Sequence, residues 1–175
     1  MISQMIGVGK AHAKIILVGE HAVVYNQPAI AIPLTNLTVT TTIQPAFVGQ
    51  TIESNTFHGG LDELGANVEG LRQLILRLIT HFQLQKAPFT IEIDTNIPQE
   101  RGFGASAAFA TSITKAFFDF ANAPLSPEQL KYFTDLEESI SHGSASGLDA
   151  ATVNSTDPIW FVKNDLPTQI GRAHV

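Results

Sequence analysis

The sequence predicts an α+β fold in which helices pack on one face of a mixed β-sheet. Segments with apolar residues at every second position, typical of strands, dominate the first third of the chain. Segments with apolar residues three and four positions apart, typical of amphipathic helices, come later and alternate with further strand patterns. This order indicates helices lying on a sheet. With 175 residues, 44% of them apolar, the chain can bury one domain-sized core.

Strands are predicted wherever apolar and polar residues alternate or a short apolar run lies between turn residues. In chain order these segments are 5–18, 29–32, 37–43, 89–93 and 158–162. Residues 47–60 contain Gly49, Asn55 and a Gly59-Gly60 pair, which favour turns. We therefore expect a loop there, with room for one short strand pair.

Helices are predicted in three longer segments and one short one. Apolar residues recur at helical spacing over 68–82, and helix-forming residues run without interruption over 105–121. A third helix should begin at Ser126-Pro127-Glu128, which supplies an N-cap hydroxyl and a first-turn proline. The small residues after Gly147 predict a short helical stretch that includes Asp149.

The composition excludes several classes of protein. Ten Lys and Arg residues against sixteen Asp and Glu residues give a net charge of −6, which argues against a surface for nucleic acid or anionic membrane. The chain has no cysteine, so disulfides and thiolate metal sites are excluded. The first seven residues have no basic stretch or long apolar stretch, and no segment approaches the ~20 apolar residues of a membrane span. We therefore expect a soluble, cytoplasmic protein.

A turn with two glycines that runs directly into a helix predicts an anion site. Gly102 and Gly104 allow the backbone to approach a ligand closely, and the helix that follows offers unpaired N–H groups at its start, so phosphate is the expected guest. Glycines before helices also serve turns and packing, and the loop alone leaves this alternative open. The phosphate site is expected over Pro98, Gln99, Glu100, Arg101, Gly102, Phe103, Gly104, Ala105, Ser106, Ala107 and Ala108.

Two more segments accompany this loop. The first is Lys14-Ile-Ile-Leu-Val-Gly-Glu-His-Ala-Val-Val-Tyr25, and the second begins at Glu138 and ends in Ser146-Gly-Leu-Asp149. In this order the three segments resemble the signature motifs of the GHMP small-molecule kinases. The string Gly-Glu-His-Ala-Val-Val-Tyr is most similar to the mevalonate kinases within that superfamily. The resemblance extends to about Asn164 and implies an S5-domain-2-like fold.

The resemblance implies an enzyme that uses ATP and Mg²⁺ to phosphorylate mevalonate to 5-phosphomevalonate, in the mevalonate route to isoprenoids. Asp149 matches the catalytic aspartate that accepts the proton of the substrate hydroxyl, and Lys14 matches its lysine partner. Glu20 and His21 correspond to groups that face mevalonate. From the residues alone, Asp149 could equally cap a helix.

Mg²⁺ would be held by Ser106 and Glu138, because the matching serine and glutamate bind it in the family. Glu138 is preferred over Glu137 because it keeps the eleven-residue spacing to the aspartate. Without the resemblance, Ser106 would be interpreted as an N-cap hydroxyl and Glu138 as a solvated helix carboxylate.

The chain departs from the family in several ways. Gly-Phe-Gly-Ala-Ser-Ala replaces the usual Gly-Leu-Gly-Ser-Ser-Ala, so that Phe103 adds bulk and Ala105 lacks a hydroxyl. Family members also continue into a second domain. We therefore expect residues 1–164 to form the amino-terminal domain, residues 165–175 to be a tail, and the carboxy-terminal domain to be absent through truncation. Such a chain should be inactive alone and should expose an apolar surface that favours self-association, for example as a homodimer.

Two alternatives stay open. One is another GHMP kinase that acts on phosphomevalonate, homoserine or a sugar. The other is a non-catalytic S5-like binding module.

Overall fold

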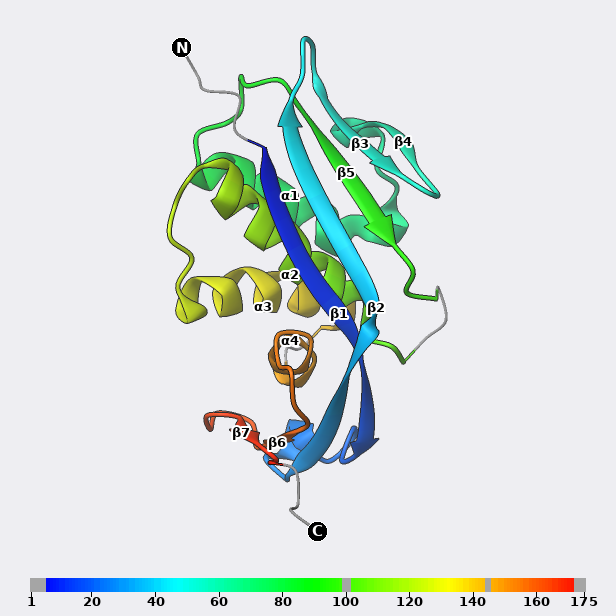
Figure 1. The fold of residues 1–175 in the computed structure, drawn as a ribbon, viewed down its shortest axis with the longest axis vertical. Coiled ribbons are helices and arrows are strands. Elements are labelled where there is room, and N and C mark those ends of the chain that lie inside the picture. Colours follow the sequence, from blue (N-terminus) through cyan, green and yellow to red (C-terminus); the bar gives the residue numbers. More distant parts are fainter. Residues whose placement is uncertain (1–5, 99–101, 144–145, 172–175) are drawn as a thin grey trace.

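The computed structural model describes residues 6–98, 102–143 and 146–171 of the chain (Figure 1). The described residues form the following strands in chain order: β1 (Gly7–Val18), β2 (Ala29–Pro45), β3 (Gln50–Ser54), β4 (His58–Gly60), β5 (Phe89–Thr95), β6 (Ile159–Phe161) and β7 (Thr168–Gln169). The helices are α1 (Glu69–His81), α2 (Ala105–Phe120), α3 (Pro127–His142) and α4 (Leu148–Thr152), with three 3₁₀ turns, η1 (Val23–Tyr25), η2 (Leu61–Glu63) and η3 (Ala66–Val68). None of the helices in these ranges has the length and apolar character needed to cross a bilayer.

The strands form one mixed sheet, as the sequence predicts. Its order is β4-β3-β5-β2-β6-β7, and β1 pairs with β2 outside this path. β3 and β5 are parallel, and the other pairs are antiparallel. The expected loop over 47–60 contains the β3–β4 pair. β7 was not predicted.

The prediction of two separate strands at 29–32 and 37–43 is wrong, because β2 runs without a break from Ala29 to Pro45. Pro33 and Asn36 suggest an interruption in the sequence. In the sheet, β2 pairs with β1 along almost its whole length, and Pro33 is paired in register with Lys14. Asn36 lies in the register shift opposite His12 and Ala13, so the irregularity is confined there and pairing with β1 continues on both sides.

The helices cover one face of the sheet, which confirms the predicted fold class (Figure 1). The main core lies between that face and helices α1, α2 and α3. It contains Phe89 and Ile91 of the sheet together with Leu78, Ile113 and Phe133 of the helices. α3 begins with the expected cap, since the Ser126 hydroxyl accepts a hydrogen bond from the Gln129 amide at 3.2 Å.

Close packing of α2 on β1 positions the site. A Cβ atom at Gly9 would collide with the backbone of α2, lying 2.5 Å from the amide nitrogen of Ala116. Along the free edge of β1, the Val8 amide donates to Asp119 Oδ2 at 2.8 Å, and Lys115 Nζ donates to the Lys10 carbonyl at 3.1 Å. The carboxy-terminal half of α2 is therefore held against the start of β1, and this packing sets the path of the helix toward the glycine loop at its other end.

Candidate active site

A buried ion pair joins β1 to α4. Lys14 is 4% exposed, and its Nζ lies 2.9 Å from Oδ1 of Asp149. Asp149 lies in the first turn of α4, two residues after the N-cap Gly147, and its side chain is 31% exposed. The pair therefore combines a desolvated cation with a carboxylate that solvent or a ligand can still reach.

The glycine loop packs on the stem of Lys14. The Lys14 amide donates to the Phe103 carbonyl at 2.9 Å. Gly104 has φ +66°, and a Cβ atom there would lie 2.5 Å from Lys14 Cε. A side chain at this position would have to displace the lysine. Gly104 is thus needed both for its left-handed backbone and for the path of Lys14.

The start of α2 presents uncapped amides. Gly104 is the N-cap residue and offers no side chain to bond them, while its carbonyl accepts from the Ala108 amide at 3.0 Å. Such a helix start attracts anions. Of the predicted phosphate segment, Pro98 and residues 102–108 lie here, and Gln99, Glu100 and Arg101 lie outside the described residues.

The Ser106 hydroxyl turns toward α3. It donates to Oε1 of Glu137 at 2.5 Å, and no hydrogen bond between it and Glu138 occurs in the described part of the chain. Ser106 is therefore not the N-cap, which is Gly104. The spacing to Asp149 selects Glu138 over Glu137 as the second metal ligand beside Ser106, and this selection stays a prediction. The hydrogen bond of the Ser106 hydroxyl in the structure is to Glu137.

Glu138 lies beside the turn at Ser146 and Gly147. Its Oε1 accepts from the Ser146 amide at 2.9 Å and from the Ser146 hydroxyl at 3.2 Å. Its Oε2 is buried and has no hydrogen-bond partner among the described residues. Burial raises the pKa of this carboxyl, hydrogen bonds from Ser146 and the nearby Gly147 amide lower it, and the negative charge of Asp149 raises it, with a net upward shift.

These groups fit a hard divalent cation. The unpartnered Oε2 of Glu138 and the nearby charge of Asp149 would both be stabilised by a cation. No cluster of three or more His, Cys, Asp or Glu side chains able to hold a metal occurs in the described ranges. Mg²⁺ typically needs only one or two carboxylates, because water and substrate phosphates complete its shell. The donor set thus suits a cation that arrives with a phosphate ligand.

Glu20 and His21 make no hydrogen bond or ion pair with Lys14, Asp149 or Ser106 among the described residues. Both are exposed, in the turn that follows β1 at Gly19. Val23, two residues after His21, packs in one hydrophobic cluster with Leu148, the residue before Asp149. The role of Glu20 and His21 toward a substrate stays a prediction.

A cavity of about 590 Å³ opens beside the start of α2, and no sequence pattern predicted it. Pro98 and Ala105 line it where it meets the glycine loop, and apolar side chains of α1 form a wall. Asn55 and Asn67 contribute amide groups. An apolar cavity with a few polar groups is typical of small-molecule sites. Local sequence patterns report only turn residues here, because the lining comes from segments far apart in the chain.

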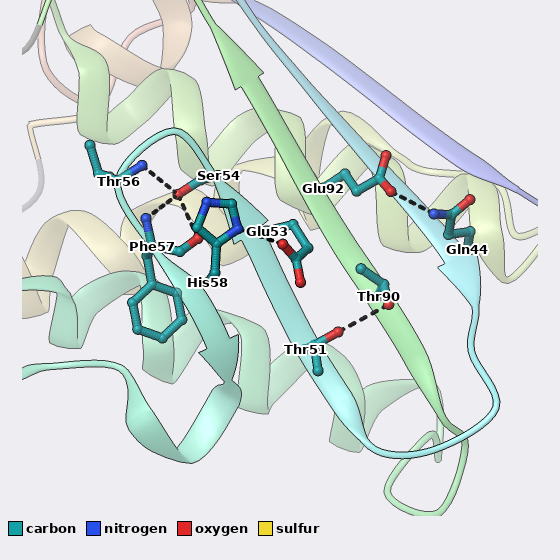
Figure 2. Close-up of polar contacts among 9 residues, drawn as sticks. All are labelled: Gln44, Thr51, Glu53, Ser54, Thr56, Phe57, His58, Thr90 and Glu92. Atoms are coloured by element: carbon teal, nitrogen blue, oxygen red, sulfur yellow. Dashed lines mark hydrogen bonds and ion pairs between the residues drawn. The ribbon is translucent and has the colours of Figure 1, made fainter.

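The β3–β4 turn that borders this cavity is fixed by Ser54 (Figure 2). The Ser54 hydroxyl accepts from the amides of Thr56 and Phe57 at 3.4 and 3.1 Å. Figure 2 also shows His58 bonded to Glu53, at 2.5 Å, on the polar outer face of the sheet. The turn thus holds its cavity-lining residues through local hydrogen bonds.

Comparisons with known proteins identify similar sequences and folds. The sequence matches the family described as GHMP kinases N terminal domain over residues 71–155. It is 31% identical to a mevalonate kinase of Methanothermobacter thermautotrophicus, over 81% of this chain and 45% of that protein. The chain spans about half the length of the curated relatives that it matches.

Two solved structures share the fold. Mevalonate kinase from methicillin-resistant Staphylococcus aureus MRSA252 is 32% identical with a TM-score of 0.72, over 95% of this chain and 55% of that one. Methanococcus jannaschii mevalonate kinase is 25% identical with a TM-score of 0.77, over 97% and 56% of the two chains.

Proposed function

The chain carries the amino-terminal domain of a GHMP kinase, and on this premise we propose that it supplies the phosphate, metal and catalytic groups of a mevalonate kinase. The reaction would transfer the γ-phosphoryl group of ATP to the primary hydroxyl of mevalonate. The observation that carries the proposal is the buried Lys14–Asp149 pair, held against the glycine loop at the start of α2.

Asp149 is proposed as the catalytic residue. Its carboxylate would accept a hydrogen bond from the acceptor hydroxyl, orient that oxygen toward the phosphorus, and take the proton as the new P–O bond forms. Lys14 holds the carboxylate through the 2.9 Å ion pair. Lys14 in turn is held by a backbone hydrogen bond to Phe103 and by packing of its side chain on Gly104. The orientation of Asp149 therefore depends on the loop that would bind the phosphates.

The start of α2 is proposed as the phosphate site. The uncapped amides after Gly104 would donate to phosphate oxygens without reorganisation, which is the usual source of electrostatic stabilisation in phosphoryl transfer. Ser106 and Glu138 would hold Mg²⁺, which would neutralise negative charge on the phosphates.

Two further regions complete the proposed site. The 590 Å³ cavity joins the glycine loop at Pro98 and Ala105, so we assign it to the base and sugar of ATP. Glu20 and His21 would contact mevalonate, with His21 as a hydrogen-bond donor.

We also propose residues 1–164 as the domain unit.

Because the chain spans about half of its relatives, the transfer is proposed for a polypeptide that also has a counterpart of their remaining half. The 175 residues alone should bind but transfer very slowly, since phosphoryl transfer needs a site closed to water. Turnover by the chain alone within tenfold of the longer polypeptide would contradict this.

The substrate is tested by assaying the longer polypeptide with ATP and Mg²⁺ against mevalonate, phosphomevalonate, homoserine and galactose. Mevalonate should give the highest kcat/KM. A higher value for any of the others would refute the substrate assignment, and no turnover with any of them would refute the kinase assignment.

A further inference from the structure

Glu137 is a buried carboxylate that has no role in the proposed reaction. It is 2% exposed, on the side of α3 that faces the other helices. Its Oε1 accepts hydrogen bonds from the hydroxyls of Ser106 and Ser141, both at 2.5 Å. Burying a carboxylate costs free energy unless it is hydrogen-bonded, so this pair of serine donors is what allows Glu137 to lie there.

The surrounding helices leave space for this carboxylate. Gly70 of α1 packs against it, and a Cβ atom at Gly70 would lie 2.8 Å from Oε1 of Glu137 and would also collide with the Ser141 hydroxyl. Three helices therefore meet at one carboxylate oxygen: α1 through Gly70, α2 through Ser106, and α3 through Glu137 and Ser141. The contact at Ser106 fixes a side chain in the first turn of α2.

The direction of the Ser106 bond has a chemical consequence. A hydroxyl has one proton to donate and two lone pairs to accept with. Ser106 gives its proton to Glu137, so only its lone pairs remain for a ligand. A phosphate oxygen would require the proton, whereas a divalent cation binds a lone pair.

We propose that Glu137 is a positioning residue that holds the Ser106 hydroxyl as a ligand for a divalent cation and prevents it from acting as a donor to phosphate. The inference rests on the proposed function, which places the cation at Ser106 and Glu138. The two adjacent glutamates then have different tasks. Glu138 offers the cation an unpartnered oxygen, and Glu137 orients the other ligand.

The test measures ATP binding by calorimetry in the 175-residue chain, with Mg²⁺ and with EDTA. Glu137→Met removes the acceptor at similar volume. It should weaken Mg²⁺-dependent ATP binding by about 10–100-fold, the usual effect of losing a partner of a metal ligand, and leave binding in EDTA unchanged. Glu137→Gln keeps an acceptor oxygen and should stay within about threefold of wild type. Ser141→Ala is the matched control, because it removes the other hydrogen bond to Glu137 and leaves Ser106 in place.

A double-mutant cycle separates positioning from packing. If Glu137 acts through Ser106, then Glu137→Met should have no further effect on Mg²⁺ dependence in a Ser106→Ala background. A purely structural role would lower the thermal midpoint and leave Mg²⁺ dependence as in wild type, which would overturn the proposal. If Glu137→Met weakens Mg²⁺-dependent ATP binding by the same factor in the Ser106→Ala background as in wild type, the proposal is overturned as well.

Two other outcomes are also decisive. If Glu137→Met does not fold, Gly70→Ala replaces it, because the added methyl displaces Glu137 while keeping its charge. It should give the same loss of Mg²⁺-dependent binding, and unchanged Mg²⁺ dependence would refute the inference. If the wild-type chain binds ATP equally well with Mg²⁺ and with EDTA, the proposed metal site fails and the role of Glu137 fails with it.

Discussion

The two ends of the proposed site differ in how far the chain itself fixes them. At the start of α2, side chains are buried and linked, and the central example is Lys14, which contacts Asp149, Phe103 and Gly104. At the far end of β1, Glu20 and His21 are exposed. The strand residues before them are exposed as well, with Leu17 at 66% and Val18 at 56%.

The difference indicates which half of the chemistry is built into these residues. A preorganised cluster can bind phosphate and cation without further ordering. Exposed groups beside apolar side chains can recognise an acceptor only when another surface covers them, since binding groups must be held in place and shielded from water. We infer that the described residues themselves hold the groups proposed for phosphate, cation and proton transfer in place, whereas they do not hold Glu20 and His21.

The largest effect on catalysis is expected when the carboxylate of Asp149 is removed. In the longer polypeptide, Asp149→Asn should lower kcat by about 10²–10⁴-fold, the usual contribution of a general base. The dissociation constant for ATP should change little, because the group acts on the acceptor hydroxyl. Steady-state kinetics and calorimetry measure the two quantities, and near-normal kcat would exclude Asp149 as the base.

Gly104→Ala should lower the stability of the fold by displacing the side chain of Lys14. A non-glycine residue in the left-handed region costs about 1–2 kcal/mol, and the added methyl must also displace the lysine stem. Gly143→Ala is the matched control, since Gly143 has φ +78° with nothing within 4 Å of an added Cβ. Chemical denaturation should show a larger loss for Gly104→Ala than for Gly143→Ala. If both variants lose the same free energy of unfolding, the contact between Gly104 and Lys14 contributes nothing to stability.

Glu138→Gln should stabilise the fold at neutral pH. The pKa of Glu138 is raised in the folded state, so the folded chain binds its proton more tightly than the unfolded chain does. Stability then falls as pH rises from the ordinary carboxyl pKa through the raised one, and the cost persists at neutral pH. The glutamine removes this cost, and each 1 kcal/mol gained raises Tm by about 2–4 °C in a domain of this size.

Thermal unfolding with and without Mg²⁺ and ATP checks the Glu138 prediction. Wild type should gain more from the ligands than Glu138→Gln does. A variant that is less stable at pH 7, or that gains equally from Mg²⁺ and ATP, would contradict the metal assignment.

The smallest effect is expected at the open end. His21→Ala should change the free energy of unfolding by less than about 0.5 kcal/mol, because the side chain is exposed. In the longer polypeptide it should raise KM for mevalonate by about tenfold or less, which corresponds to one hydrogen bond. ATP binding should not change. A large loss of ATP binding would show that the two ends are not separable.

The sequence predicted the fold class and most elements because strand and helix periodicities are local. The amphipathic pattern over 68–82 became α1, and Ser126-Pro127 began α3 as expected. The break expected inside β2 was wrong, since pairing on both sides of a strand is invisible in its own residues.

The site was predictable only in part for the same reason. Motif resemblance brought Lys14 and Asp149 together across 135 residues, and the structure places them 2.9 Å apart. The Ser106–Glu137 bond and the Gly104–Lys14 contact depend on how helices and strands pack, which no local pattern reports. The cavity beside α2 is assembled from several separate segments and was missed entirely.

The most direct test of the central claim is an amide NMR titration of the 175-residue chain with ATP and Mg²⁺, followed by mevalonate. Our account predicts that ATP with Mg²⁺ shifts the amides of residues 102–108 and those around Asp149, and leaves Glu20 and His21 unchanged. Mevalonate should add little in this chain. Saturable shifts confined to other surfaces, or no shifts at residues 102–108 with ATP and Mg²⁺, would contradict a preorganised phosphate site at the start of α2.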